Sequence, residues 1–372
     1  MSPRLLVFLL GATLIGQSYA VAQSFGLTAG AAKLESAGAL AFGPPGILFV
    51  GDSTAGAVFA LDTRDRTART EGPEIAITGI DQKIAAMLGT TPSDIRFHDV
   101  KVNPVSKNIY LAVSRGRGPD AIPVLLRIEA SAAPTEPTIT ELRTDNIPHA
   151  RVALPGLPNA PKGPRRRTSR ELVITDLQYS DGELVIAGLS NEDFSSTLRV
   201  VPFPFPKAER GASIGTSVEI YHTSHFTYET DSPVRTMVPY TVGGERYLLA
   251  AYTCTPLVKL RMSDLKAGAH VTGETLAELG RHSSPLDMIL YKKEGHDFLL
   301  VANTARGVLK LSIDHLERFA PVNEDGGNPA QIAMQRVVGL KGVVQLDAYD
   351  ATRAIMLLDS RDGLDLKLVA LP

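Results

Sequence analysis

The stretch DMILYKKEGHDFLLVANTARGVLKLSI, residues 287–313, decides the fold. It contains three short apolar runs separated by the polar turns KKEG and NTARG, a pattern typical of consecutive β-hairpins. The middle run, FLLVA, is apolar at every position, as expected of a strand that is buried on both faces. Asp287 stands at the start of the first run, so a carboxylate opens the unit.

Five further units with the same pattern can be aligned along the chain. They begin with GALAFGPPGILFVGD (38–52), DVKVNPVSKNIYLAV (99–113), DLQYSDGELVIAGLS (176–190), TMVPYTVGGERYLLAAYT (236–253) and DAYDATRAIMLLDS (347–360). A weaker fourth apolar run follows most units, and four antiparallel strands per unit predict an all-β fold, a six-bladed β-propeller. The last unit ends after its third run. We therefore expect the N-terminal stretch SFGLTAGAAKL (24–34) to supply the missing outer strand and close the ring.

The blade core GALAFGPPGILFVGD resembles the broad group of six-bladed propellers that includes NHL-repeat proteins, strictosidine synthase-like proteins and gluconolactonases. This resemblance covers nearly the whole mature chain, but only as a blade pattern, and such patterns serve many activities. RFHDVKVNP (96–104) resembles a metal-binding segment of gluconolactonase-like hydrolases, with His98 at the position of a metal-binding Asn. Thr175 stands where that family has another Asn ligand, and Leu286 stands where it has a catalytic Asp.

Residues 1–22 have the features of a secretory signal peptide: a basic start, the short apolar run LLVFLLGATLIG, and small residues around Ala20 and Ala22. The sequence thus predicts a secreted or periplasmic protein in which residues 23–372 form a single propeller domain. No membrane span is expected after signal cleavage. The 38 basic and 40 acidic residues give a net charge of -2, which argues against a nucleic-acid partner. The single cysteine excludes an internal disulfide.

Polar residues are predicted to gather at one end of the propeller, the top face, where innermost strands start and second strands end. The predicted innermost-strand starts are Gly38, Asp99, Asp176, Thr236, Asp287 and Asp347. The predicted second-strand ends are Asp52, Ser114, Ser190, Thr253, Asn303 and Asp359. From these sets, the expected ligand-binding residues are Asp52, Ser114, Asp176, Ser190, Asp287, Asn303, Asp347 and Asp359.

The aspartates at the strand starts have two interpretations. In the first, His98, Asp99, Asp176 and Asp287 hold Ca²⁺ or another divalent cation, which would serve a lactonase-like hydrolase together with Asp359. In the second, each carboxylate accepts backbone N–H bonds from its own or the adjacent blade and fixes how the blades dock. A residue that recurs in four of six units is better explained by the fold than by one site.

Other side chains could carry chemistry at the same end. The candidate catalytic residues are His98, Asp99, Arg235 and Cys254, because a cysteine nucleophile needs a nearby base and a cationic group. The alternatives are a rim histidine bonded to a neighbouring loop and a buried inert thiol. His222 and His225 have a spacing that occurs in zinc or copper sites, but no third ligand accompanies them.

A proline- and arginine-rich insertion, residues 144–172, connects two units at the predicted top face. Its dense basic run, Arg165, Arg166 and Arg167, could dock an acidic protein, or it could be a solvated loop. We therefore expect a binding or scaffold module that recognises a protein or a small ligand on its top face, with the metal-dependent hydrolase as the alternative. The sequence leaves open whether the chain is an enzyme.

Overall fold

The computed structural model describes residues 25–69, 72, 74–129, 137–158, 169–206, 215–223, 226–253, 256–280, 282–328 and 331–372. This part of the chain is almost entirely β-structure, which confirms the predicted all-β class. Its one α-helix is α2 (Ile80–Leu88). Among the described residues, no helix is long and apolar enough to cross a membrane. The short 3₁₀ turns are η1 (Pro92–Asp94), η2 (Gly118–Asp120), η3 (Ser169–Leu172), η4 (Met262–Asp264) and η5 (Leu316–Arg318).

Each sequence repeat folds as an antiparallel meander, numbered here as units 1 to 6 in chain order. Units 1, 2 and 3 contain β2 (Leu40–Phe42), β3 (Ile47–Asp52) and β4 (Ala57–Asp62); β6 (Ile95–Val102), β7 (Ile109–Arg115), β8 (Ile122–Ile128) and β9 (Ile139–Glu141); and β11 (Asp176–Ser180), β12 (Glu183–Leu189), β13 (Ser196–Pro202) and β14 (Thr216–His222). Units 4, 5 and 6 contain β16 (Val234–Val242), β17 (Glu245–Tyr252), β18 (Pro256–Arg261) and β19 (His270–Glu278); β20 (Pro285–Lys293), β21 (His296–Asn303), β22 (Gly307–Ser312) and β23 (Met334–Arg336); and β24 (Val343–Ala348), β25 (Arg353–Ser360) and β26 (Gly363–Ala370).

The hairpins follow from local chemistry. Asp181 and Gly182 join β11 to β12 with φ of 52° and 84°, as a two-residue turn with left-handed backbone at both positions requires. Glu294 and Gly295 do the same between β20 and β21, with φ of 53° and 86°. The second strands are apolar because both of their faces are covered; every residue of β3, for example, is buried.

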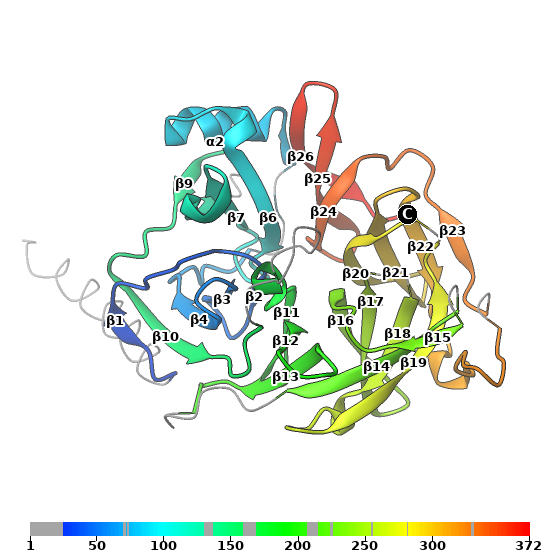
Figure 1. The fold of residues 1–372 in the computed structure, drawn as a ribbon. Coiled ribbons are helices and arrows are strands. Elements are labelled where there is room, and N and C mark those ends of the chain that lie inside the picture. The colour runs from blue at the N-terminus through cyan, green and yellow to red at the C-terminus, as the bar shows by residue number, and fades with distance from the viewer. Residues whose placement is uncertain are drawn as a thin grey trace, which may run out of the picture.

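The units form a β-propeller, because their innermost strands contact one another in a closed ring (Figure 1). The order around the ring is β6, β2, β11, β16, β20 and β24, which corresponds to units 2, 1, 3, 4, 5 and 6. Six apolar clusters in the described residues fill the six spaces between neighbouring units, and each draws side chains from both neighbours. Units 1 and 2 are therefore exchanged relative to their order in the sequence.

The predicted closure by the N-terminal stretch is wrong. β1 (Thr28–Gly30) pairs with β10 (Ile147–Ala153), and both strands lie on the outer side of unit 1. The outer strand of unit 6 is β5 (Ala76–Ile77), which pairs with β26. After β4 the chain therefore crosses to unit 6, builds unit 2, and returns to unit 1 as β10, which lies inside the predicted insertion 144–172.

The crossing segment between β4 and β5 is fixed to unit 2 by one buried carboxylate. Asp65 Oδ2 accepts hydrogen bonds from Ser106 Oγ at 2.7 Å, Tyr110 OH at 2.9 Å, and Asn103 Nδ2 and Asn108 Nδ2 at 3.0 Å each. All five residues are buried. The sharp turn that joins β6 to β7 is thus built around a residue of the segment that leaves unit 1, which fixes this segment to unit 2.

Units 3 and 4 also share a seam at the outer rim. β14 pairs in parallel with β19, and β15 (Thr227–Glu229) adds to β14 in antiparallel. The pairing merges the two units into a single nine-stranded sheet, so the described residues contain five hydrogen-bonded sheets.

Candidate ligand-binding site at the centre of the ring

Three buried aspartates form one level inside the ring, near the start of the innermost strands. Oδ1 of each carboxylate accepts the backbone N–H of the following residue in the same strand, at 2.7 Å for Asp99, 2.7 Å for Asp176 and 2.8 Å for Asp287. Oδ2 of each accepts an amide N–H of the next unit in the ring: Leu40 at 2.7 Å, Met237 at 2.7 Å and Leu346 at 3.0 Å, respectively. These bonds agree with the structural interpretation of the aspartates.

The ring order explains the spacing of these carboxylates. Asp99, Asp176 and Asp287 belong to units 2, 3 and 5, which alternate with units 1, 4 and 6 around the ring. Each carboxylate therefore joins one pair of neighbouring units: 2 with 1, 3 with 4, and 5 with 6. The exchange of units 1 and 2 is what makes the pattern regular.

Two of the predicted strand starts need correction. The amides that donate to the Oδ2 atoms belong to the residues directly after Ala39, Thr236 and Gln345. Ala39 and Gln345 therefore occupy the positions that were assigned to Gly38 and Asp347. The same one-residue bulge precedes Asp99, Thr236, Asp287 and Gln345 in their strands, which identifies Gln345 as the equivalent position in β24. Asp347 lies two residues farther along β24, and its Oδ2 accepts the amide of Val102 at 2.7 Å.

Sequence reasoning missed the side chain that these acids surround. The Lys101 side chain is only 10% exposed, and its Nζ lies 3.9 Å from Asp99 Oδ1 and 4.0 Å from Asp347 Oδ1. Within the described residues this ammonium makes no hydrogen bond, although it has three donors. Lys101 is two residues after Asp99 in a strand, hence on the same face, and that spacing was the available signal.

Burial and mutual charge set the ionisation of this cluster. Burial raises the pKa of Asp99 and that of Asp176 to about 7, against the opposing effect of Lys101. Burial likewise raises the pKa of Asp347. Burial alone would lower the pKa of Lys101, but the carboxylates, Asp99 foremost, hold it well above its usual value. The lysine is therefore charged at neutral pH.

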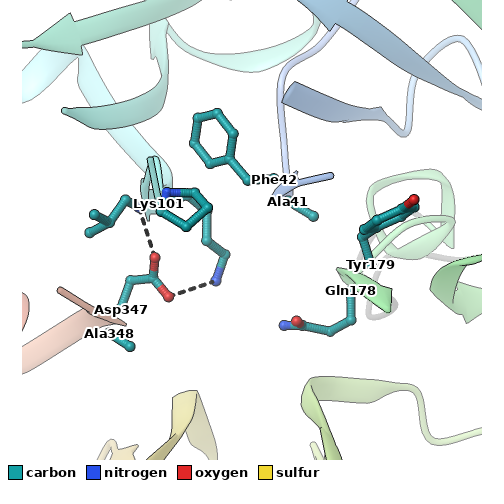
Figure 2. A pocket seen from close by; sticks show the side chains of 9 residues that line it. Ala41, Phe42, Lys101, Gln178, Tyr179, Asp347 and Ala348 are labelled. Carbon is teal, nitrogen blue, oxygen red and sulfur yellow. Dashed lines mark hydrogen bonds and ion pairs between the residues drawn. The ribbon is translucent and has the colours of Figure 1, made fainter. Parts of the chain in front are cut away.

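A cavity of about 220 Å³ opens beside Lys101, at the end where the innermost strands finish, which we call the bottom face. Four innermost strands and the turn after β6 supply its walls (Figure 2): Ala41, Phe42, Lys101, Val102, Pro104, Gln178, Tyr179, Asp347 and Ala348. In Figure 2 the Gln178 amide extends toward the Lys101 ammonium. The cavity lies at the opposite end from the predicted top-face site.

The predicted catalytic histidine lies at the top face. His98 is the bulged residue of β6, and its Nε2 lies 3.0 Å from Ser114 Oγ. Burial, with help from Arg96 and Arg235, lowers the pKa of His98 to about 4. Arg235 comes from unit 4, three places away in the ring, and its charge contributes to the lowered pKa of His98. A neutral imidazole with so low a pKa is a weak base at neutral pH.

The predicted second-strand ends make local contacts. Asp52 accepts the amides of Glu35, Ser36 and Ala55 at 2.7 to 3.0 Å, and Ser190 Oγ accepts the amide of Glu192 at 3.3 Å. The Asn303 amide is buried, and among the described residues it has no hydrogen-bond partner. Asp359 is exposed to solvent. The structure therefore does not bring these side chains together into one site.

Several candidates cannot be placed. Residues 1–22, Arg165, Arg166, Arg167, His225 and Cys254 lie outside the described residues.

His222 is buried between two carboxylates, with Nδ1 2.9 Å from Glu229 Oε1 and Nε2 3.7 Å from Glu278 Oε2. Over the part of the chain that the structure describes, no three His, Cys, Asp or Glu side chains are arranged to hold a metal ion.

Comparisons with known proteins add little. No family model and no curated relative matches the sequence. Among solved structures, a glucose dehydrogenase-type oxidoreductase from Thermus thermophilus is similar at a TM-score of 0.37 and 10% identity, over 92% of this chain and 100% of that one. An aldose sugar dehydrogenase with bound PQQ from Streptomyces coelicolor gives 0.34 and 9% over 92% and 98%, and a mitotic checkpoint complex gives 0.33 and 7% over 92% and 94%. Scores this low carry no argument about this chain.

Proposed function

We propose that this chain is an exported six-bladed β-propeller that works as a binding module and takes a small ligand at the centre of its ring. The count of six blades is supported by the closed cycle of innermost strands and by the six inter-unit apolar clusters of the described residues. Secretion or periplasmic location rests on the signal-peptide features of residues 1–22.

One observation carries the binding role: Lys101, whose side chain is 10% exposed and whose ammonium makes no hydrogen bond within the described residues, faces a cavity of about 220 Å³. The two carboxylates beside this ammonium lie at 3.9 and 4.0 Å, beyond hydrogen-bond distance, so the site favours an occupant that supplies an oxygen atom closer to Nζ. The volume is below the range of roughly 300–1,000 Å³ of pockets for drug-sized molecules, which indicates a small ligand.

The same geometry does not favour the metal-dependent hydrolase. Asp99, Asp176 and Asp287 already accept two backbone amides each, and these bonds orient their oxygens toward neighbouring strands. Leu286, which stands where related lactonases have a catalytic Asp, can neither bind a metal nor move a proton. Docking of a protein partner through residues 144–172 stays a prediction.

The test is a fragment screen that detects binding by ligand-observed NMR against the wild type and Ala348→Phe. Ala348 lines the cavity but is exposed, so a phenyl ring there should block the entrance without disturbing the core. Ala370→Phe is the matched control, because Ala370 is also an exposed strand residue of unit 6 and lies away from the cavity lining.

We expect fragments that bind the wild type and Ala370→Phe and lose at least about tenfold in affinity, or ~1.4 kcal/mol, in Ala348→Phe. A screen in which no fragment distinguishes these two variants would contradict the proposed binding role.

A further inference from the structure

The chemistry of the cavity next to Lys101 restricts what it can bind, an inference that rests on the proposed binding role. Lys101 Nζ, which donates, and Asp347 Oδ1, which accepts, both line the cavity and lie 4.0 Å apart. Asp347 Oδ2 is already committed to the amide of Val102. A ligand that meets both polar atoms must therefore offer an acceptor and a donor close together, and a hydroxyl group is both.

The charge of the surroundings disfavours ionic ligands. Four carboxylates, Asp99, Asp176, Asp287 and Asp347, interact with the single Lys101 ammonium. An anion would meet this excess of acidic groups. A cation would have to replace or lie beside the Lys101 ammonium, which shares the same cavity wall. A neutral ligand avoids both penalties.

The remaining walls suit a polar molecule with C–H faces. Phe42, Pro104 and Tyr179 supply apolar surface around the polar pair. The Gln178 amide makes no hydrogen bond within the described residues and extends into the cavity toward Lys101 (Figure 2). It therefore adds a donor and an acceptor on the side opposite Asp347.

We propose that this cavity binds a small, neutral, hydroxyl-rich molecule. One hydroxyl oxygen accepts a hydrogen bond from Lys101 Nζ, a hydroxyl proton is donated to Asp347 Oδ1, and the Gln178 amide bonds to a further hydroxyl. The site lies at the bottom face, away from His98 and the other residues of the top face.

The experiment compares three probes that share a chain of hydroxyl groups and differ in charge: sorbitol, gluconate and glucamine, measured by ligand-observed NMR titration at pH 7. We expect sorbitol to bind, and gluconate and glucamine to bind at least about tenfold more weakly. Sorbitol should lose at least about tenfold in Ala348→Phe and nothing in Ala370→Phe.

Two lining variants test the assigned contacts. Gln178→Leu should weaken sorbitol binding by about threefold to tenfold, the usual effect of one lost hydrogen bond. Lys101→Met should weaken sorbitol binding by more than tenfold. This variant removes the cationic group that faces the four acids of the cluster, so Lys101→Arg is measured in its place if Lys101→Met does not fold.

The outcomes separate the two proposals. If gluconate or glucamine binds more tightly than sorbitol in an Ala348→Phe-sensitive manner, the neutral class is overturned while the binding role stands. If sorbitol binds but Gln178→Leu binds it equally well, the assigned contacts are overturned. If no probe and no fragment is sensitive to Ala348→Phe, the binding role itself fails.

Discussion

Replacing Asp65 with alanine should be among the most damaging single changes in the protein. Its Oδ2 accepts four hydrogen bonds from buried donors of unit 2, and Asp65→Ala leaves the Tyr110 hydroxyl and the Ser106 hydroxyl without this acceptor. A hydrogen bond to a charged acceptor contributes ~1.5–3 kcal/mol, so four independent bonds would sum to roughly 6–12 kcal/mol. Bonds that share one oxygen are not additive.

We therefore expect the free energy of unfolding to fall by about 4–5 kcal/mol, a large share of the ~5–15 kcal/mol typical of folded proteins. Urea denaturation of wild type, Asp65→Ala, Tyr110→Phe and the double variant measures this quantity and its coupling. Tyr110→Phe should cost about 1 kcal/mol alone and almost nothing once Asp65 is gone. A loss below about 1 kcal/mol in Asp65→Ala would refute the idea that this carboxylate holds the crossing segment in place.

Further expectations concern the centre of the ring. Asp176→Asn should lower the free energy of unfolding by about 2 kcal/mol in urea denaturation, because the new side-chain NH₂ group faces the backbone N–H of Leu177 or Met237, which is also a donor. The control variant Asp181→Asn, at an exposed position, should change it by no more than about 0.5 kcal/mol. Asp99 and Asp176 have a folded-state pKa of about 7 against an ordinary 3.8, so between these values the folded state keeps protons that the unfolded state has released. The free energy of unfolding should therefore decrease as pH rises from 4 to 7 and level off above 7, and Asp99→Asn/Asp176→Asn should flatten this slope; a wild-type stability that rises over the window would contradict the assigned pKa values. His98 should titrate in NMR spectra with a pKa of about 4, and a midpoint near 6.5 would show that it is not buried as described.

Much of the local structure could be predicted from the sequence, because hairpins depend on neighbouring residues. The turn at Asp181 and Gly182 and the buried run of β3 are set by residues within a few positions of each other. The exchange of units 1 and 2 could not be predicted, because it depends on β5, whose two residues, Ala76 and Ile77, pair with a strand almost three hundred positions away. A pattern of apolar residues specifies that a strand pairs, but not with which strand.

The candidate site was predictable to a similar degree. The repeated aspartates predict a shared role, which Asp99, Asp176 and Asp287 have. Asp347 lies two residues beyond the equivalent position, Gln345, and the sequence does not distinguish the two because residues two apart in a strand lie on the same face. Lys101 was overlooked because a single lysine in a strand is ordinarily a surface residue. Only the closed ring brings acids from four separate units around it.

The crossing of the chain also dictates when folding can finish. Residues 76–77 emerge early in synthesis, yet their partner strand ends at residue 370, so this edge waits unpaired until almost the whole polypeptide has been made. Unit 1 likewise lacks its outer neighbour until residue 153 is available. The ring can therefore close only when nearly the whole polypeptide is available, although units 3, 4 and 5 draw all their strands from one continuous stretch.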